Sequence, residues 1–143
     1  MVQSKNNGAT DLRQSGSDKG FIAFAAVSGA VSVMAGAFAA HGLSADAEPV
    51  RVGWLHTGSL YEALHALAMM AVASLAAAGR LNQKCSVAAQ WLFLVGGVLF
   101  PAALYGLVFH GPRLLGAVAP VGGTAFILGW LMVAAAAWLS RDS

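Results

Sequence analysis

The chain has 143 residues, of which 58% are hydrophobic and only 10% are charged, and its net charge is +2. A soluble domain carries about 25% charged residues, and a helix in water needs a wet face, so this composition excludes an ordinary soluble protein. The basic residues form no cluster or stripe, which argues against nucleic acid as a partner. The single cysteine, Cys85, excludes an intrachain disulfide.

The first 19 residues differ in composition from everything that follows. They are rich in Gly, Ser, Asn and charge, and they show no apolar periodicity. Such a segment has too little apolar surface to bury. Residues 1–19 are therefore predicted to be a disordered tail.

Four apolar segments follow the tail, and each is long enough to cross the hydrocarbon core, which takes about 20 helical residues. They cover about residues 20–40, 57–78, 87–109 and 115–139. Lipid offers the backbone no hydrogen-bond partners, so each segment is expected to be a helix. The sequence thus predicts an all-α fold, an integral membrane four-helix bundle over residues 20–140.

The first apolar segment has a second interpretation. A basic tail, an apolar run and the small residues of Ala37-Phe38-Ala39 are also typical of a cleaved signal peptide. The tail is long for a signal peptide, and the apolar run is long enough to span a bilayer. We therefore expect this segment to remain as the first helix of the bundle.

Basic residues predict how the bundle is oriented. Of the eight Lys and Arg residues, only Arg51 and Arg113 fall on one side of a four-helix topology. The other six share the opposite side, namely Lys5, Arg13, Lys19, Arg80, Lys84 and Arg141. Loops rich in Lys and Arg stay in the cytoplasm, so the predicted topology is N-in/C-in with a cytoplasmic tail.

Small residues indicate where the helices pack. Transmembrane helices associate through close backbone approach rather than through water exclusion. Small residues recur at close spacing in the first and fourth segments, namely Ser28, Ser32, Gly36, Gly122, Gly123 and Gly129. These positions are predicted to pack helices within one bundle, with contact between oligomer subunits as the alternative.

Two ionisable residues lie inside a predicted membrane segment, where such residues are candidate functional groups. Glu62 and His65 are three residues apart, which puts them on one face of a helix. If the helix begins near Thr57, both lie in the outer third of the bilayer. We predict that this face points inward, and that the polar centre of the bundle comprises His41, Thr57, Tyr61, Glu62, His65 and Tyr105.

Three roles are open for Glu62 and His65. They can join helices by hydrogen bonds, form a proton or substrate site, or bind a metal or haem, because Glu-x-x-His is half of a di-metal ligand set. The third and fourth segments contain no Asp, Glu or His in their cores, which weakens the third role. No phosphate loop, nucleophile elbow or metalloprotease motif is present, so the sequence predicts no catalytic residue, metal site or cofactor.

Four stretches of the chain resemble one family. Residues 36–43 (GAFAAHGL) are similar to its GAFGAHGL element, and residues 57–68 (TGSLYEALHALA) to its TG..YQ.YHALAL element. Residues 97–105 are similar to G..LF.GSLY, and residues 115–130 to LGAITPIGG....GW. The chain thus resembles the DUF423 family of small bacterial inner-membrane proteins, related to eukaryotic transmembrane protein 256.

The resemblance implies a multi-pass, four-helix protein of the bacterial inner membrane with no established biochemical function. Two departures matter. Glu62 stands where the family often has Gln, which argues against a strictly required charge, and Pro101-Ala102-Ala103 replaces Ser-Gly-Ser.

The sequence favours a non-enzymatic structural or accessory protein of the membrane. Its expected partners are the lipid bilayer and other membrane subunits or a second copy of itself. One alternative is a small proton-linked carrier that acts as an oligomer. The other is a metal- or haem-binding membrane protein.

Overall fold

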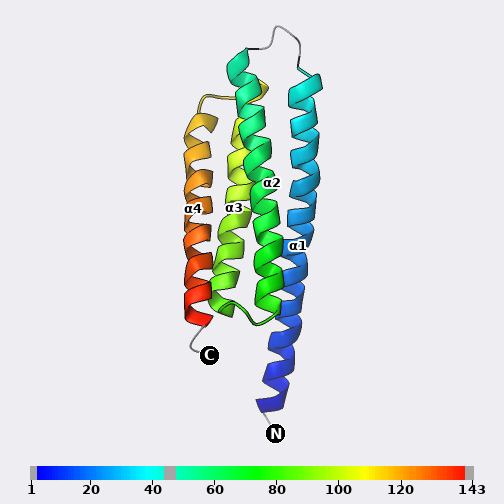
Figure 1. The fold of residues 1–143 in the computed structure, drawn as a ribbon, viewed down its shortest axis with the longest axis vertical. Coiled ribbons are helices and arrows are strands. Elements are labelled where there is room, and N and C mark those ends of the chain that lie inside the picture. The colour runs from blue at the N-terminus through cyan, green and yellow to red at the C-terminus, as the bar shows by residue number, and fades with distance from the viewer. Residues whose placement is uncertain (1–2, 44–47, 141–143) are drawn as a thin grey trace.

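The computed structural model describes residues 3–43 and 48–140, with side chains from residue 19 onward. Four helices make up the fold: α1 (Gln3–His41), α2 (Pro49–Ala77), α3 (Gln83–Val108) and α4 (Leu115–Leu139) (Figure 1). Each contains a stretch that is long and apolar enough to cross a membrane. The predicted all-α, four-helix membrane architecture is confirmed.

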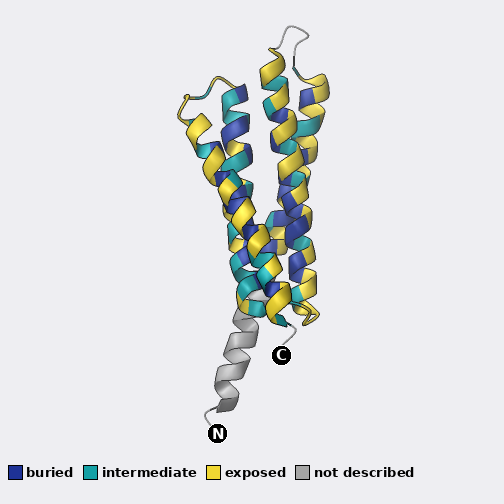
Figure 2. Cartoon of the chain, turned by 60° about the vertical axis from the view of Figure 1, so that its left-hand side comes forward, coloured by how far each residue is buried: buried dark blue, intermediate teal, exposed yellow. Residues whose placement is uncertain are grey.

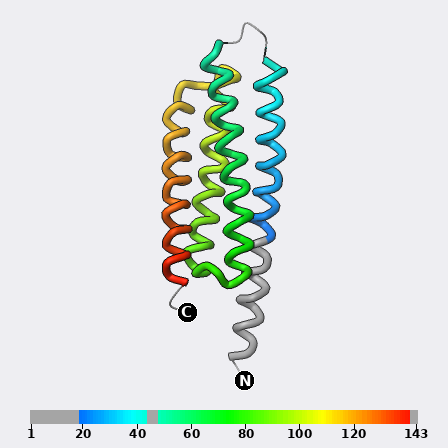
Figure 3. Tube along the Cα trace, in the orientation of Figure 1, coloured from blue at the N-terminus to red at the C-terminus, as the bar shows by residue number. Residues whose placement is uncertain are grey.

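Successive helices run antiparallel, so the connections alternate between the two ends of the molecule (Figure 3). The α1–α2 and α3–α4 connections lie at one end, and the α2–α3 connection and the end of α4 lie at the other. Lys19, Arg80 and Lys84 therefore share one end, whereas Arg51 and Arg113 lie toward the opposite end. Arg141 lies outside the described residues.

The four helices do not form a closed square. In the described part of the chain, α1 packs on α2, α2 on α3 and α3 on α4, whereas α2 and α4 make almost no close backbone contact. Figure 2 shows the α1–α2 and α3–α4 pairs diverging toward the end opposite the termini. The bundle is thus open between α2 and α4.

Helix α2 begins about two turns before the predicted start near residue 57. Pro49 occupies the start of the helix, where its fixed φ suits the first turn and its missing N–H costs nothing. Arg51 is accommodated because its Nε donates to the Val108 carbonyl at the end of α3, 2.9 Å away. Glu62 and His65 consequently lie near the middle of α2, further from its start than the predicted helix bounds imply. Their position in the outer third of the bilayer stays a prediction.

The N-terminal part of α1 also differs from the sequence prediction. The helix extends back to Gln3, where a disordered tail is predicted. No proline interrupts residues 3–41, and extending an existing helix needs no new nucleus. The stretch that can cross a membrane still begins at Lys19. Residues 1–2 of the predicted tail lie outside the described residues.

Large apolar side chains cover the outside of the bundle, and several polar ones lie inside. Val33, Leu67 and Trp138 are among the exposed side chains, whereas Glu62 and His65 are buried. Exposed residues follow the outward faces of the helices (Figure 2). A lipid-facing surface has this pattern because the hydrocarbon core is as apolar as the side chains that face it.

The predicted packing face of α1 lies against α2. Ser28 and Ser32 are buried, and the Ser32 hydroxyl donates to the Gly29 carbonyl, 2.7 Å away. A Cβ added to Gly36 would lie 3.7 Å from the Ser59 hydroxyl of α2. These small residues therefore allow the two helix backbones to approach.

The glycines of α4 pack against aromatic residues of α3. A Cβ added to Gly122 would lie 2.6 Å from the Phe100 backbone nitrogen, and one at Gly129 would lie 2.6 Å from the Phe93 ring. At Gly123 the same atom would stay 3.8 Å from the Phe100 ring. Gly122 and Gly129 thus set the close approach of α3 and α4, whereas Gly123 has room.

Candidate functional site

The Glu62 side chain joins α2 to α3. Tyr105 donates its hydroxyl hydrogen bond to Glu62 Oε2 over 2.7 Å, and Glu62 is only 5% exposed. The Tyr105 ring fits because Gly58 lies beneath it: a Cβ there would come within 2.6 Å of Tyr105 Cε1. No basic side chain of the described residues pairs with Glu62. One turn of α2 thus provides both the space for the tyrosine ring and the acceptor for its hydroxyl.

His65 uses both of its ring nitrogens. Its Nδ1 lies 2.7 Å from the Tyr61 carbonyl of the same helix, and Trp130 of α4 donates its indole N–H to Nε2 over 3.1 Å. A carbonyl only accepts and an indole N–H only donates. The network therefore assigns the proton to Nδ1 and makes His65 a neutral imidazole.

An aromatic cluster surrounds the His65 ring. The ring stacks on Phe126 with centroids 3.5 Å apart and an interplanar angle of 11°. Phe93 and Trp130 lie at 5.5 Å and 6.1 Å. These rings come from α3 and α4, so His65 joins three helices by stacking as well as by hydrogen bonds.

Gln90 makes a further polar contact between helices. It is buried, and its Nε2 donates to the Met69 carbonyl of α2 over 2.9 Å. Its Oε1 is buried without a hydrogen-bond partner in the part of the chain that the structure describes. This contact ties the other half of α2 to α3.

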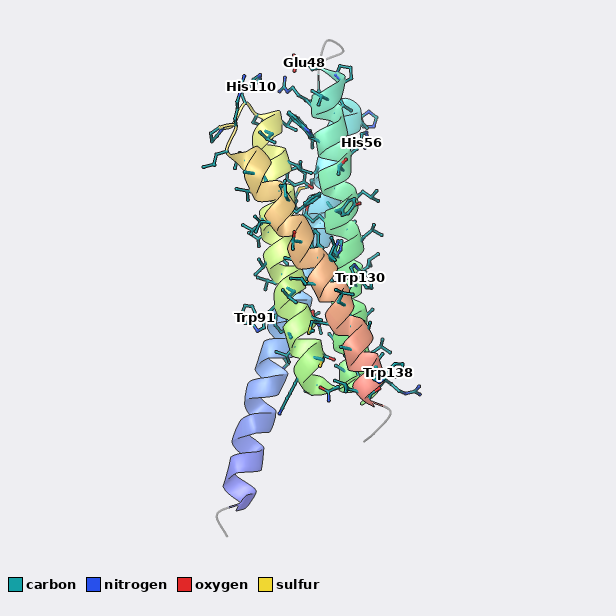
Figure 4. All side chains as sticks on the ribbon, turned by 90° about the vertical axis from the view of Figure 1, so that its left-hand side faces the viewer. Glu48, His56, Trp91, His110, Trp130 and Trp138 are labelled. Atoms are coloured by element: carbon teal, nitrogen blue, oxygen red, sulfur yellow. The ribbon has the colours of Figure 1, made fainter. Side chains whose placement is uncertain are left out.

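A groove of about 870 Å³ opens between α2 and α4. Aromatic rings form part of its wall, and aliphatic and small side chains form the rest. It is lined by Thr57, Tyr61, Leu64, His65, Leu67, Ala68, Ala71, Phe100, Pro120, Gly123, Thr124, Phe126, Ile127 and Trp130. Figure 4 shows Trp130 at mid-height, reaching from α4 toward α2. The open side of the bundle is therefore a defined cavity rather than a flat surface.

Polar atoms of the groove fall into two groups. Those of His65, Trp130 and Thr124 are engaged within the protein, the last by donation to the Pro120 carbonyl over 2.8 Å. The Thr57 and Tyr61 hydroxyls have no hydrogen-bond partner among the described residues. None of the described residues that line the groove is Lys, Arg, Asp or Glu.

The structure separates the six residues of the predicted polar centre. Glu62 and Tyr105 meet, and His65 contacts the Tyr61 backbone. Thr57 and Tyr61 are exposed side chains of the groove. His41 is exposed at the end of α1. In the described ranges, no three His, Cys, Asp or Glu side chains lie close enough to hold a metal ion together.

A family model described as "Protein of unknown function (DUF423)" matches residues 35–123. The chain belongs to the DUF423 family. Within the chain, the match covers the end of α1, all of α2 and α3 and the first third of α4. It includes Glu62, His65 and Tyr105, whereas four groove residues lie beyond it, namely Thr124, Phe126, Ile127 and Trp130.

Several bacterial proteins are similar to this DUF423 chain over most of their length. The "UPF0382 inner membrane protein YgdD" of Escherichia coli strain K12 is 41% identical over 82% of this chain and 89% of its own. The "UPF0382 membrane protein YwdK" of Bacillus subtilis strain 168 is 41% identical over 83% and 96%. A "UPF0382 membrane protein" of Haemophilus influenzae is 35% identical over 85% and 96%. No solved structure matches the chain.

These names agree with the four spans. This DUF423 protein is a multi-pass membrane protein of unestablished biochemical function.

Sequence reasoning missed three residues of the site, Trp130, Phe126 and Gln90. Trp130 carries a donor into an otherwise apolar helix, and Gln90 interrupts an apolar run; both are signals for a partner across the bundle. Phe126 carried no comparable signal, because a phenylalanine in a membrane helix is ordinary.

Proposed function

We propose that this DUF423 protein is a non-enzymatic accessory protein of the bacterial inner membrane that binds another membrane component in the groove between α2 and α4. The groove supports this proposal because its volume falls in the range of about 300–1,000 Å³ that is typical of ligand sites. It also opens toward the outside of the bundle, where large apolar side chains are exposed.

The proposal rests on the contrast between polar side chains that are hydrogen-bonded within the protein and polar side chains that have no partner among the described residues. Tyr105 of α3 donates to Glu62 of α2, and Trp130 of α4 donates to His65 of α2, which is how buried polar residues join membrane helices. The other His65 ring nitrogen is bonded to the Tyr61 carbonyl of its own helix. Thr57 and Tyr61 keep hydroxyls that no described residue binds. Free hydroxyls beside an apolar cavity favour binding of a partner over a purely internal role.

The experiment places a photo-crosslinking amino acid at Ile127 in the groove and, separately, at Val27 on α1. Both side chains are 62% exposed, but only Ile127 lines the groove. Illumination of native membranes should give a discrete adduct from Ile127, identified by mass spectrometry as lipid or protein, that Val27 does not give. The same adducts from both positions would show that the groove is ordinary lipid-facing surface.

We also propose that both termini face the cytoplasm, because Lys19, Arg80 and Lys84 share one end of the bundle. Cys85 lies near that end, in the first turn of α3. An impermeant thiol reagent should leave Cys85 unlabelled in intact cells and label it in inverted vesicles. The reverse pattern would invert the topology.

Glu62 favours one alternative, a small proton-linked carrier acting as an oligomer. Its carboxyl is buried near the middle of α2 without a basic partner in the described ranges, and such groups occur in proton relays. The carrier requires that Glu62→Gln leave a folded protein without transport in proteoliposomes. The accessory role requires that groove-specific crosslinking at Ile127 survive this substitution.

A further inference from the structure

We propose that the groove between α2 and α4 binds a neutral membrane lipid whose head is a flat ring bearing carbonyl oxygens, the chemistry of an isoprenoid quinone. This inference rests on the proposed function, because it names the component that the groove takes. Four properties of the groove lead to it: charge, polar atoms, aromatic rings and apolar length.

The uncharged lining of the groove favours a ligand with an uncharged head group. No Lys, Arg, Asp or Glu is among its lining residues, and His65 is held neutral by its two hydrogen bonds. A phosphate or carboxylate head would enter this apolar site without a cation to pair with, which is costly. The groove therefore fits an uncharged head better than that of a phospholipid.

The two hydroxyls without a partner among the described residues favour a ligand that carries hydrogen-bond acceptors. Thr57 and Tyr61 are one turn apart on α2, so they lie on the same face of the helix. Both line the groove, and neither hydroxyl is engaged within the described residues. A hydroxyl can donate to a carbonyl oxygen, and lipid tails offer no such acceptor. A ring with carbonyl oxygens at this end of the groove would satisfy both donors.

Aromatic rings make the wall beside these hydroxyls suitable for a flat head. The Tyr61 and Phe100 rings lie 5.2 Å apart, and Phe100 and Phe126 lie 5.8 Å apart. His65 stacks on Phe126, and all four rings line the groove. Flat rings pack on such a surface by offset or edge-to-face contact.

The rest of the groove is apolar and follows the helices. Leu64, Leu67 and Ala71 of α2 face it, with Ile127 and Trp130 of α4 opposite. The single polar atom among these side chains, Trp130 Nε1, is bound to His65. This apolar part of the groove suits the branched apolar tail of the lipid, and the head group lies toward Thr57.

The test uses a decyl-tailed benzoquinone as the probe and the tryptophan fluorescence of the purified protein in nanodiscs as the signal. Of the four tryptophans, Trp130 lines the groove and should be quenched by bound quinone, whereas Trp54, Trp91 and Trp138 are not among the lining residues. Figure 4 shows Trp91 and Trp138 elsewhere on the bundle. Wild type should show quenching that saturates, above the linear quenching that a quinone free in the bilayer gives. Purely linear quenching would overturn the proposal.

Two leucine substitutions on α4 locate the site. Gly123→Leu fills the groove, which Gly123 lines, and Gly116→Leu adds the same side chain where a Cβ would meet nothing within 4 Å. Saturable quenching should disappear in Gly123→Leu and persist in Gly116→Leu. If it persists in both, the quinone binds elsewhere and the proposal is overturned.

Two further variants keep the test decisive should Gly123→Leu fail to fold. Thr57→Val and Tyr61→Phe each remove one free hydroxyl, and each should weaken saturable quenching by roughly fivefold, the value of one hydrogen bond. Unchanged affinity in both variants would overturn the assignment of the head group.

The outcome also separates this inference from the function on which it rests. A groove-specific adduct at Ile127 that proves to be phospholipid or a second copy of this chain, together with linear quinone quenching, would overturn the quinone and leave the accessory role standing. The absence of any groove-specific adduct would overturn the accessory role itself. Competition of the Ile127 adduct by the decyl quinone would support both.

Discussion

The two sides of α2 have opposite characters although they share one helix. Toward α3, Gly58 admits the Tyr105 ring and Glu62 accepts its hydroxyl hydrogen bond, so side chains fill the junction and satisfy each other. Toward α4, the Thr57 and Tyr61 hydroxyls have no partner among the described residues and lie beside a groove of about 870 Å³. The comparison teaches that neighbouring polar residues of one helix, such as Tyr61 and Glu62, can serve different purposes, one facing an occupant and the other holding helices together.

This contrast has a physical cause in the spacing of the helices. Where a glycine faces a helix, the backbones approach and the polar groups find partners in the protein. Between α2 and α4, the Trp130–His65 hydrogen bond and the Phe126 ring stacked on His65 are contacts that cross the gap. The remainder of that face is open because the two helices make almost no close backbone contact.

The largest effect on stability is expected from adding a side chain where α3 and α4 are too close to accommodate it. Gly122→Ala places a Cβ 2.6 Å from the Phe100 backbone nitrogen, so α3 and α4 must move apart, at a cost of about 1–3 kcal/mol. Gly123→Ala is the matched control, since its Cβ stays 3.8 Å from the nearest ring atom. Both substitutions gain the same helix propensity, so their difference isolates the contact.

Thermal unfolding in detergent measures this difference. The transition of Gly122→Ala should lie well below that of Gly123→Ala. Equal transitions would show that α3 and α4 are not held at this distance, and the contrast between a packed and an open face would lose its basis.

The next effect comes from His65, which contacts Trp130 and Phe126 of α4 across the open side. His65→Leu strands the Trp130 indole N–H and removes the ring that stacks on Phe126. It should cost on the order of 1–2 kcal/mol, as membrane side-chain hydrogen bonds do. Thermal unfolding beside wild type checks this value, and an unaffected His65→Leu would mean that α4 is held by α3 alone.

A smaller effect is expected at Glu62. Gln keeps the size of the side chain and an acceptor for the Tyr105 hydroxyl, so Glu62→Gln should cost less than about 1 kcal/mol, the net value of one hydrogen bond. Tyr105→Phe removes the donor instead and leaves a buried carboxyl without a partner, which should cost about 1–2 kcal/mol. The pair is measured by thermal unfolding. A strongly destabilised Glu62→Gln beside an unaffected His65→Leu would point to a required charge.

Much of the fold follows from the sequence because membrane spans are read from apolar length alone. The four helices were predicted on that basis. The inward position of Glu62 and His65 was predicted because an ionised group that faces lipid is costly. The start of α2 was not, because Arg51 resembles a loop residue until its donation to the Val108 carbonyl of α3 is known.

The candidate site was less accessible to sequence reasoning. Which residue of α4 meets His65 depends on the rotation and height of two helices far apart in the chain, and periodicity along one helix does not encode these. Trp130 was therefore missed, and His41 was grouped with residues from which the structure separates it. The groove itself depends on the lack of contact between α2 and α4, which no motif signals.

The smallest effect on stability is expected at the free hydroxyls, and it is the sharpest test of the comparison. Thr57→Val and Tyr61→Phe remove groups that no described residue binds, so each should change stability by less than about 0.5 kcal/mol. The Tyr61 ring still packs on Phe100 in Tyr61→Phe, and the carbonyl that accepts from His65 belongs to the backbone. Thermal unfolding of the purified variants in detergent without added lipid measures this change in stability.

A loss of stability as large as that of His65→Leu would show that these hydroxyls hold the bundle together. Both faces of α2 would then be structural, and the groove would lose the polar end on which its ligand was assigned. Unchanged stability together with weakened quinone quenching would separate the two roles on a single helix.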